Sequence, residues 1–261
     1  MARWLVHGLI PSGSSVVLMG ELHSGKAWLA EQLAICVGSG HDFLDAFRVD
    51  QQRVILIDED SGTSSFTRRF ERLARGLNVD LRETPIDCYS RCGFLLYDRE
   101  RREWLRDLIR KQRGTPLVII DSLERIMGGE LAGEGEHSPL ADFCHELRDA
   151  GGTMVVVHQT GARRQTRVED WDVRKEARGF TVLIECFDLA LATFRAPTAQ
   201  TEFVVKPIVR ESQVKLTRPF TVALREDPEL TWARLVLIDE VPELRGMHRR
   251  EMLPQVVEKT T

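Results

Sequence analysis

Short apolar runs alternate with amphipathic segments of helix length along the first 160 residues of the chain. The runs are rich in Val, Ile, Leu and Met, and they cover residues 15–19, 53–58, 117–120 and 153–157. The segments between them predict helices over residues 26–37, 63–76, 100–112 and 138–149. Strands that are apolar at nearly every position are typical of a parallel sheet with helices on both faces. The pattern therefore predicts an α/β fold with a mostly parallel central sheet.

The pattern changes after residue 188, where strand-like segments follow one another with only short turns between them. These segments cover residues 188–193, 201–206, 220–224 and 235–238. We expect them to extend one edge of the sheet as antiparallel strands. Residues 128–139 are Gly-rich, acidic and without apolar periodicity, which indicates a mobile loop.

Composition and charge narrow the class of protein. Of the 261 residues, 43% are hydrophobic and 29% are charged, as in ordinary globular proteins, and no apolar run approaches the roughly 20 residues that cross a bilayer. The net charge of −4 does not indicate nucleic-acid binding by the whole chain, so any such site must be a local patch. Five scattered cysteines fit reduced thiols. We expect a cytoplasmic protein without a membrane partner.

A loop with phosphate-binding spacing lies between the first predicted strand and the first predicted helix. It reads Gly20-Glu21-Leu22-His23-Ser24-Gly25-Lys26-Ala27, which has the G-x-x-x-x-G-K spacing in its required context. Such a loop points backbone N–H groups at an anion, the helix N-terminus adds a positive dipole end, and Lys26 supplies a charge for the outer phosphates. Ala27 stands where the motif has Ser or Thr, so one ligand of Mg²⁺ is missing. We therefore predict nucleotide binding with weaker Mg²⁺ binding and slower hydrolysis.

Polar side chains follow three of the predicted strands. Asp121 comes after the run at residues 117–120, where a carboxylate beside the loop would coordinate Mg²⁺; a helix N-cap is the alternative. Glu59 and Asp60 come after the second strand, where a carboxylate can act as a general base on water; a solvated acidic turn is the alternative. Gln159 follows the fourth strand and is in a position to contact a γ-phosphate.

Together these motifs resemble those of RecA-like P-loop NTPases, and within them the RepA-like group of hexameric replicative helicases. The resemblance extends from residue 9 to residue 224 and depends mainly on GELHSGKA at 20–27, VILIDED at 54–60 and the Asp-Ser-Leu block at 121–123. It implies a single RecA-like NTPase domain over residues 1–240 and a C-terminal tail over residues 241–261. It also implies a ring-forming ATPase, a hexamer of this chain, that acts on DNA and binds ATP and Mg²⁺ between neighbouring subunits.

The resemblance assigns roles to individual residues of the predicted site. Lys26 would bind phosphates, Asp121 would position Mg²⁺ and Gln159 would sense the γ-phosphate. The family's catalytic Glu falls at Asp60, whose side chain is one methylene shorter. Asp60 or its neighbour Glu59 would therefore act on the attacking water, or neither would.

Two basic residues late in the chain resemble those that the family inserts into the adjacent subunit's site. They are Lys206 and Arg210, and the alternative is that they are charges that protect an edge strand from aggregation. Because Ala27 and Asp60 both depart from the family pattern, two functions stay open. One is a DNA-associated ATPase in replication, recombination or repair, and the other is a catalytically weakened nucleotide-binding scaffold or regulatory subunit.

A cluster of basic residues follows the fourth predicted strand, although acidic residues are interleaved with it. Its first members are Arg163, Arg164 and Arg167. In RecA-like proteins the loop after this strand contacts single-stranded DNA, and arginines on a loop are suited to phosphate contacts. A solvated helix of mixed charge is an equally good interpretation.

Overall fold

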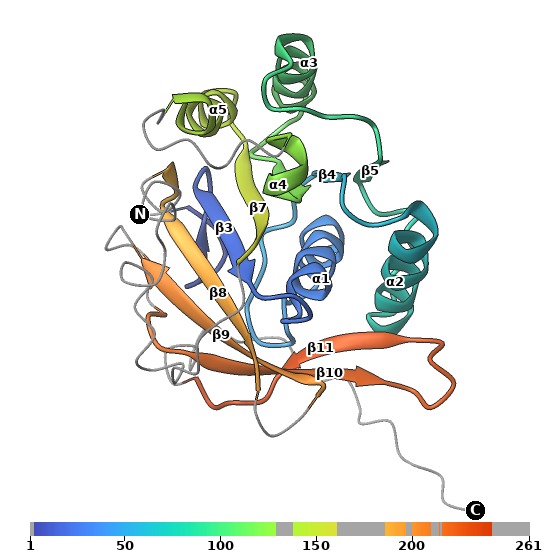
Figure 1. Ribbon diagram of the computed structural model, residues 1–261. Helices are drawn as coiled ribbons and strands as arrows, with labels where there is room; N and C mark the ends of the chain where they lie inside the picture. Colours follow the sequence, from blue (N-terminus) through green and yellow to red (C-terminus); the bar gives the residue numbers. More distant parts are fainter. Residues whose placement is uncertain are drawn as a thin grey trace, which may run out of the picture.

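The computed structural model describes residues 3–128, 138–160, 186–196, 200–209, 214 and 216–241. Within these residues the centre of the molecule is a nine-stranded sheet in the order β11-β10-β9-β8-β3-β7-β6-β4-β5 (Figure 1). A separate pair of short strands, β1 (Trp4–Val6) and β2 (Ile10–Pro11), precedes it. Most of the loop predicted at residues 128–139 and most of the tail predicted at 241–261 lie outside the described residues.

Six neighbouring strands of the sheet run parallel to one another. They are β3 (Ser15–Gly20), β4 (Val54–Asp58), β5 (Ile86–Ser90), β6 (Leu117–Asp121), β7 (Thr153–Gln159) and β8 (Leu189–Arg195). All residues of β3 and β4 are buried, as expected for strands that are covered on both faces. The predicted α/β fold with a mostly parallel sheet is confirmed.

The last three strands, β9 (Glu202–Val209), β10 (Phe220–Glu226) and β11 (Ala233–Leu237), are antiparallel to their neighbours, as predicted. The prediction was wrong for β8, which pairs with β3 in parallel. The reason lies at the start of the strand, where the Asp188 carboxylate accepts hydrogen bonds from the Ser15 backbone N–H at 2.8 Å and from Arg148 at 2.9 Å. These contacts hold the first residues of β3 and β8 together, so both strands leave in the same direction.

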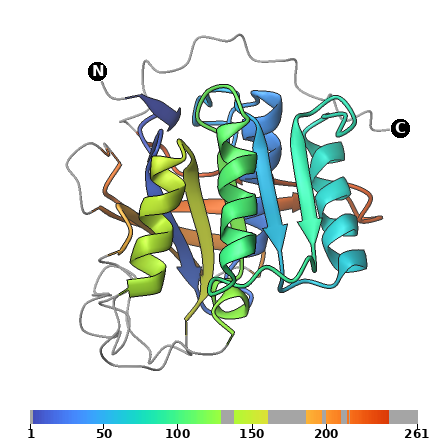
Figure 2. The same cartoon turned by 90° about the horizontal axis from the view of Figure 1, so that it is seen from above.

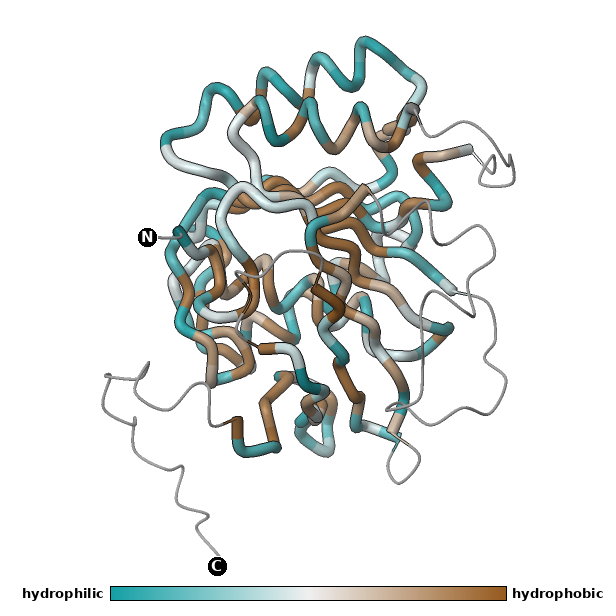
Figure 3. The backbone as a smooth tube through the Cα atoms, turned by 90° about the vertical axis from the view of Figure 1, so that its left-hand side faces the viewer, coloured by the Kyte–Doolittle hydropathy of each residue, from teal (hydrophilic) through white to brown (hydrophobic). Residues whose placement is uncertain are grey.

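Helices cover both faces of the sheet. On one face lie α3 (Arg99–Arg110), α4 (Leu123–Ile126) and α5 (Ser138–Asp149); α3 and α5 lie in front of the strands in Figure 2. On the other lie α1 (Lys26–Ser39) and α2 (Thr63–Gly76). The hydropathy colouring in Figure 3 places the apolar residues in the central strands and polar ones along the outer helices. None of the helices described here is long and apolar enough to cross a membrane.

The antiparallel strands curve around the second face and enclose α1 between the parallel strands of the sheet and β11 (Figure 1). The buried Gln32 side chain of α1 hydrogen-bonds both the backbone oxygen of Leu235 at 2.7 Å and its backbone N–H at 2.6 Å. Ten of the fourteen residues of α1 are buried as a result. The helix that follows the phosphate-binding loop is therefore fixed in the core.

Candidate functional site

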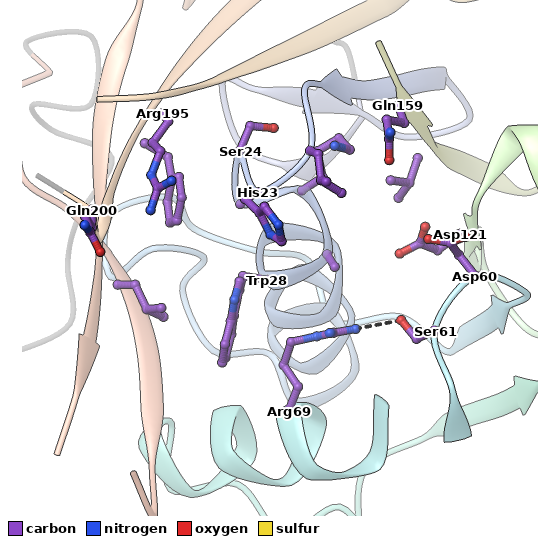
Figure 4. A pocket seen from close by; sticks show the side chains of 17 residues that line it. His23, Ser24, Trp28, Asp60, Ser61, Arg69, Asp121, Gln159, Arg195 and Gln200 are labelled. Atoms are coloured by element: carbon purple, nitrogen blue, oxygen red, sulfur yellow. Dashed lines mark hydrogen bonds between the residues drawn. The ribbon is translucent and has the colours of Figure 1, made fainter. Parts of the chain in front are cut away.

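The carboxyl ends of the parallel strands meet beside the loop at residues 20–27. Gly20 is opposite Gln159 of β7 and Thr193 of β8, and Asp58 of β4 is opposite Asp121 of β6. A cavity of about 560 Å³ opens there, and Figure 4 shows the side chains that line it. This volume lies in the range of small-molecule binding sites, and open α/β sheets bind ligands at this edge.

Backbone conformation prepares the loop for an anion. Gly25 has a φ of 85°, and α1 begins directly after it without a side-chain cap, so the first N–H groups of the helix are not bound by a capping side chain. The Lys26 ammonium donates hydrogen bonds to the backbone oxygens of Gly20 at 2.8 Å and Glu21 at 2.7 Å. Burial lowers the pKa of Lys26, and nearby carboxylates, Asp121 among them, oppose this effect. The loop thus holds a positive charge in a partly buried place.

Two buried hydroxyls tie the loop to β8. Thr193 donates to the backbone oxygen of Met19 at 3.1 Å, and Ser24 contacts the Thr193 hydroxyl at 2.8 Å. Since Thr193 has a single hydroxyl hydrogen, Ser24 is the donor in their contact. A Cβ on Gly20 would lie 2.4 Å from the Thr193 backbone oxygen, so glycine is required there. The Ser24 hydroxyl therefore faces the sheet and does not replace the hydroxyl that Ala27 lacks.

Carboxylates crowd the opposite wall of the cavity. Burial, with help from Asp58 and Asp60, raises the pKa of Asp121 to about 7. Asp58 accepts a hydrogen bond from the Ser61 backbone N–H at 2.9 Å, while its buried Oδ2 has no partner among the described residues. A cation beside these groups would reduce their repulsion, so the donor set fits Mg²⁺. No three His, Cys, Asp or Glu side chains of the described segments could hold a metal by themselves, so phosphate oxygens would have to complete its coordination.

The two candidate general bases point in different directions. Glu59 accepts hydrogen bonds from the Phe94 backbone N–H at 2.8 Å and the Cys92 thiol at 3.2 Å, and it does not line the cavity. Asp60 lines the cavity, is about half exposed and accepts a hydrogen bond from Arg125 at 2.9 Å. Only Asp60 is placed to contact a ligand in the cavity.

Of the remaining predicted site residues, some line the cavity and others do not. Gln159 lines the cavity, and its backbone N–H donates to Glu124 at 2.7 Å. Lys206 does not line it, because it alternates along β9 with Phe203 and lies on the other face of the sheet. The other basic candidates lie outside the described residues: Arg163, Arg164, Arg167 and Arg210.

Comparison with known proteins agrees with this geometry. Residues 1–165 match the family model described as AAA domain. The chain belongs to the AAA domain family. The solved structure of the ATPase domain of G40P is similar to this AAA domain protein, with a TM-score of 0.61 over 87% of this chain and 86% of that one, at 14% sequence identity. These findings confirm the predicted RecA-like fold of a P-loop NTPase.

The AAA domain match covers one part of the cavity wall. The loop, Asp60, Asp121 and Gln159 lie inside the matched residues, whereas Phe203 of β9 and the whole of β10 lie beyond them. The wall at the antiparallel end therefore comes from the C-terminal part of the chain. Its members are Arg195, Gln200, Phe203 and Leu224.

Several lining residues of the AAA domain were not predicted from the sequence. Trp28 lies in the first turn of α1, and the Arg72 guanidinium is 5.6 Å from its ring centre. Arg69 of α2 enters the cavity beside Ser61 (Figure 4). The available signals were a Trp two residues after Lys26 and an Arg on the helix predicted over residues 63–76.

Proposed function

We propose that this AAA domain protein binds ATP in the cavity and acts as a DNA-associated ATPase. The observation that carries the proposal is a cavity of about 560 Å³ that is lined by the loop with Lys26 and by Asp121, Asp60 and Gln159. A cationic loop beside a helix N-terminus suits the phosphates, and carboxylates opposite it suit a metal and a water molecule. The volume accommodates a ligand of nucleotide size.

Each residue then has a task during hydrolysis. Lys26 binds the outer phosphates, and Asp121 would hold Mg²⁺, which would supply positive charge to offset that of the phosphate oxygens. Asp60 accepts a proton from the attacking water, and Gln159 contacts the γ-phosphate. Since Ala27 gives the metal no ligand and Ser24 is turned toward Thr193, turnover is slow.

The same observation supports a second function. A nucleotide site with an incomplete metal side is suited to a scaffold or regulatory subunit, which needs bound nucleotide more than turnover. Steady-state ATP hydrolysis with and without single-stranded DNA separates the two functions. Stimulation by DNA supports the ATPase, and turnover at background with intact ATP binding supports the scaffold.

ATP binding through Lys26 is the first point to test. A fluorescent ATP analogue is titrated into the wild type, Lys26→Ala and the control Lys111→Ala, which removes an exposed lysine at the end of α3. Loss of a charge-assisted phosphate contact of about 1.5–3 kcal/mol should weaken binding about 10- to 150-fold in Lys26→Ala only. Equal affinities in all three proteins would reject the proposed nucleotide site.

DNA binding and ring formation are the finer parts of the proposal. Neutralising Arg163, Arg164 and Arg167 should weaken single-stranded DNA binding and reduce its salt slope by about 0.7 for each lost phosphate contact. In a hexamer, Lys206 and Arg210 would complete a neighbour's site, and such trans contacts contribute about 10³–10⁵ in rate. Mixing Lys26→Ala subunits with Lys206→Ala subunits should then restore some activity, and light scattering should show the oligomer. Strictly monomeric protein would contradict a shared site.

A further inference from the structure

One arginine of α2 enters the cavity on its carboxylate side. In Figure 4 Arg69 extends toward Ser61, on the side of Asp60 and Asp121 and away from Arg195. Its Nη2 donates to the Ser61 hydroxyl at 3.1 Å, and its side chain is 19% exposed. The guanidinium is therefore part of the cavity wall.

A buried glutamate of α1 holds this arginine in place. Glu31 is 4% exposed, and both of its oxygens accept hydrogen bonds from Arg69 Nε at 2.8 Å, with Nη2 as a further donor. Burial raises the pKa of Glu31, and Arg69 opposes that effect. A buried ion pair is often no more stabilising than apolar side chains of the same size. Its clear consequence here is geometric, because it fixes the direction of the guanidinium.

Part of the guanidinium remains available to a ligand. Among the described residues, Arg69 donates hydrogen bonds from Nε and Nη2 only. Its Nη1 makes no hydrogen bond with that part of the chain. Arg69 also attracts Asp121 and Asp58, whose charges help to raise its pKa against the opposing effect of burial. It thus lies within electrostatic reach of the residues that would hold a metal, in a cavity that Ala27 also lines.

We propose that Arg69 is a nucleotide-binding residue that Glu31 positions. Its guanidinium contacts the triphosphate on the metal side of the cavity and supplies there a fixed positive charge. An arginine is suited to this task because it stays charged, and its Nη1 still carries N–H donors for phosphate oxygens. Nucleotide binding by this chain therefore depends less on Mg²⁺ than binding by a loop with Ser or Thr at the position of Ala27. The inference rests on the proposed function, since it needs nucleotide in this cavity.

The test measures ATP affinity in Mg²⁺ and in EDTA for the wild type and matched variants. Arg69→Met should weaken binding about 10- to 150-fold in both buffers, the range for loss of one charge-assisted contact. The control Arg68→Met removes an exposed arginine from the adjacent position of α2 and should leave affinity unchanged. The ATP affinity of the wild type should fall less than about threefold when EDTA replaces Mg²⁺. The ATP affinity of Ala27→Ser should fall more than that of the wild type under the same change.

A second variant separates binding from folding. Arg69→Met leaves Glu31 buried without its partner, which destabilises the fold. The double variant Glu31→Met/Arg69→Met removes both charges at similar volume, so it should keep the wild-type circular dichroism and still bind ATP weakly. Glu31→Gln, which keeps the hydrogen-bond acceptor but loosens the arginine, should fall between the wild type and Arg69→Met.

The outcomes distinguish failure of the proposed role of Arg69 from failure of the proposed ATP binding. A folded double variant with wild-type affinity would overturn the role of Arg69, even if Lys26→Ala loses binding. A wild type that loses more than about tenfold in EDTA would overturn the reduced dependence on Mg²⁺. If neither the wild type nor any variant binds ATP, the proposed function fails and this inference fails with it.

Discussion

Replacement of Gly25 by alanine tests how tightly the loop is built. Gly25 has a φ of 85°, in the left-handed region, and an added Cβ would lie 2.8 Å from the ring of Phe203. Phe203 is 4% exposed and packed in the core, so its ring has little room to move. Two separate penalties therefore act on Gly25→Ala, one from backbone conformation and one from overlap.

The two penalties can be given magnitudes. A left-handed conformation costs an L-residue about 1–2 kcal/mol. Forcing an extra carbon into a packed core costs roughly 1–3 kcal/mol more. Gly25→Ala should therefore lower the free energy of unfolding by roughly 2–5 kcal/mol.

Two other glycines of the chain are matched controls. Gly13 has a φ of 80° with nothing within 4 Å of an added Cβ, so Gly13→Ala should show the conformational penalty alone, about 1–2 kcal/mol. Gly62 has a φ of −74° and the same open space, so Gly62→Ala should change stability by less than about 0.5 kcal/mol. Urea denaturation of the three variants compares their free energies of unfolding. The comparison requires that the three m-values are equal.

The overlap itself can be isolated by a double-mutant cycle. In a Phe203→Leu background Gly25→Ala should be less destabilising, because the ring that the Cβ meets is gone. A Gly25→Ala variant no less stable than Gly13→Ala, together with additive effects in the cycle, would refute the close packing of the loop against β9. The affinity for the ATP analogue should fall with the same variant, since the loop must shift.

Three further predictions concern the metal side, the hydroxyl pair and pH. Ala27→Ser should raise Mg²⁺-dependent ATP turnover, measured by phosphate release, and unchanged background turnover would place the defect at Asp60. Thr193→Val keeps the side-chain volume but leaves Ser24 without its acceptor, so urea denaturation should show a loss of about 1–3 kcal/mol, and Ser24→Ala in that background should restore part of it. Because the pKa of Asp121 is raised to about 7, the folded protein keeps a proton that the unfolded chain releases near pH 4. The free energy of unfolding should therefore fall as pH rises from about 4 to about 7, by at most about 1.4 kcal/mol per pH unit from this group, and Asp121→Asn should flatten the slope in denaturant titrations.

Features that depend on neighbouring residues in the sequence were predicted well. The bounds of α2 and α5 agree with the prediction, and those of β3, β6 and β7 differ by at most two residues, because the helices have a clear apolar period and the strands are continuous apolar runs. β5 was not predicted, since Asp87 and Ser90 interrupt its apolar pattern at a half-exposed edge. The direction of β8 depends on Asp188 and Ser15, which are 173 residues apart.

The same holds for the site: features set by neighbouring residues could be predicted, and features set by residues far apart in the sequence could not. The loop could be found because strand, glycines, lysine and helix are contiguous in the sequence. Glu59 and Asp60 could not be told apart, since their directions depend on the backbone of Phe94, 35 residues after Glu59. Arg69 and Phe203 come from elements remote from the loop, and no short motif marks their approach.

The enclosure of α1 between the parallel and the antiparallel strands of the sheet has a consequence for hydrogen exchange. The helix contacts five parallel strands, α2 and β11, and its residues from Leu29 to Gly38 are all buried. Amides in such an element exchange only when the whole domain unfolds, whereas the exposed turn around Leu230 exchanges through small local openings. Any ligand at the site therefore meets a helix that burial already protects from exchange. Added protection on binding should appear in the loop between Gly20 and Gly25 and hardly at all in α1.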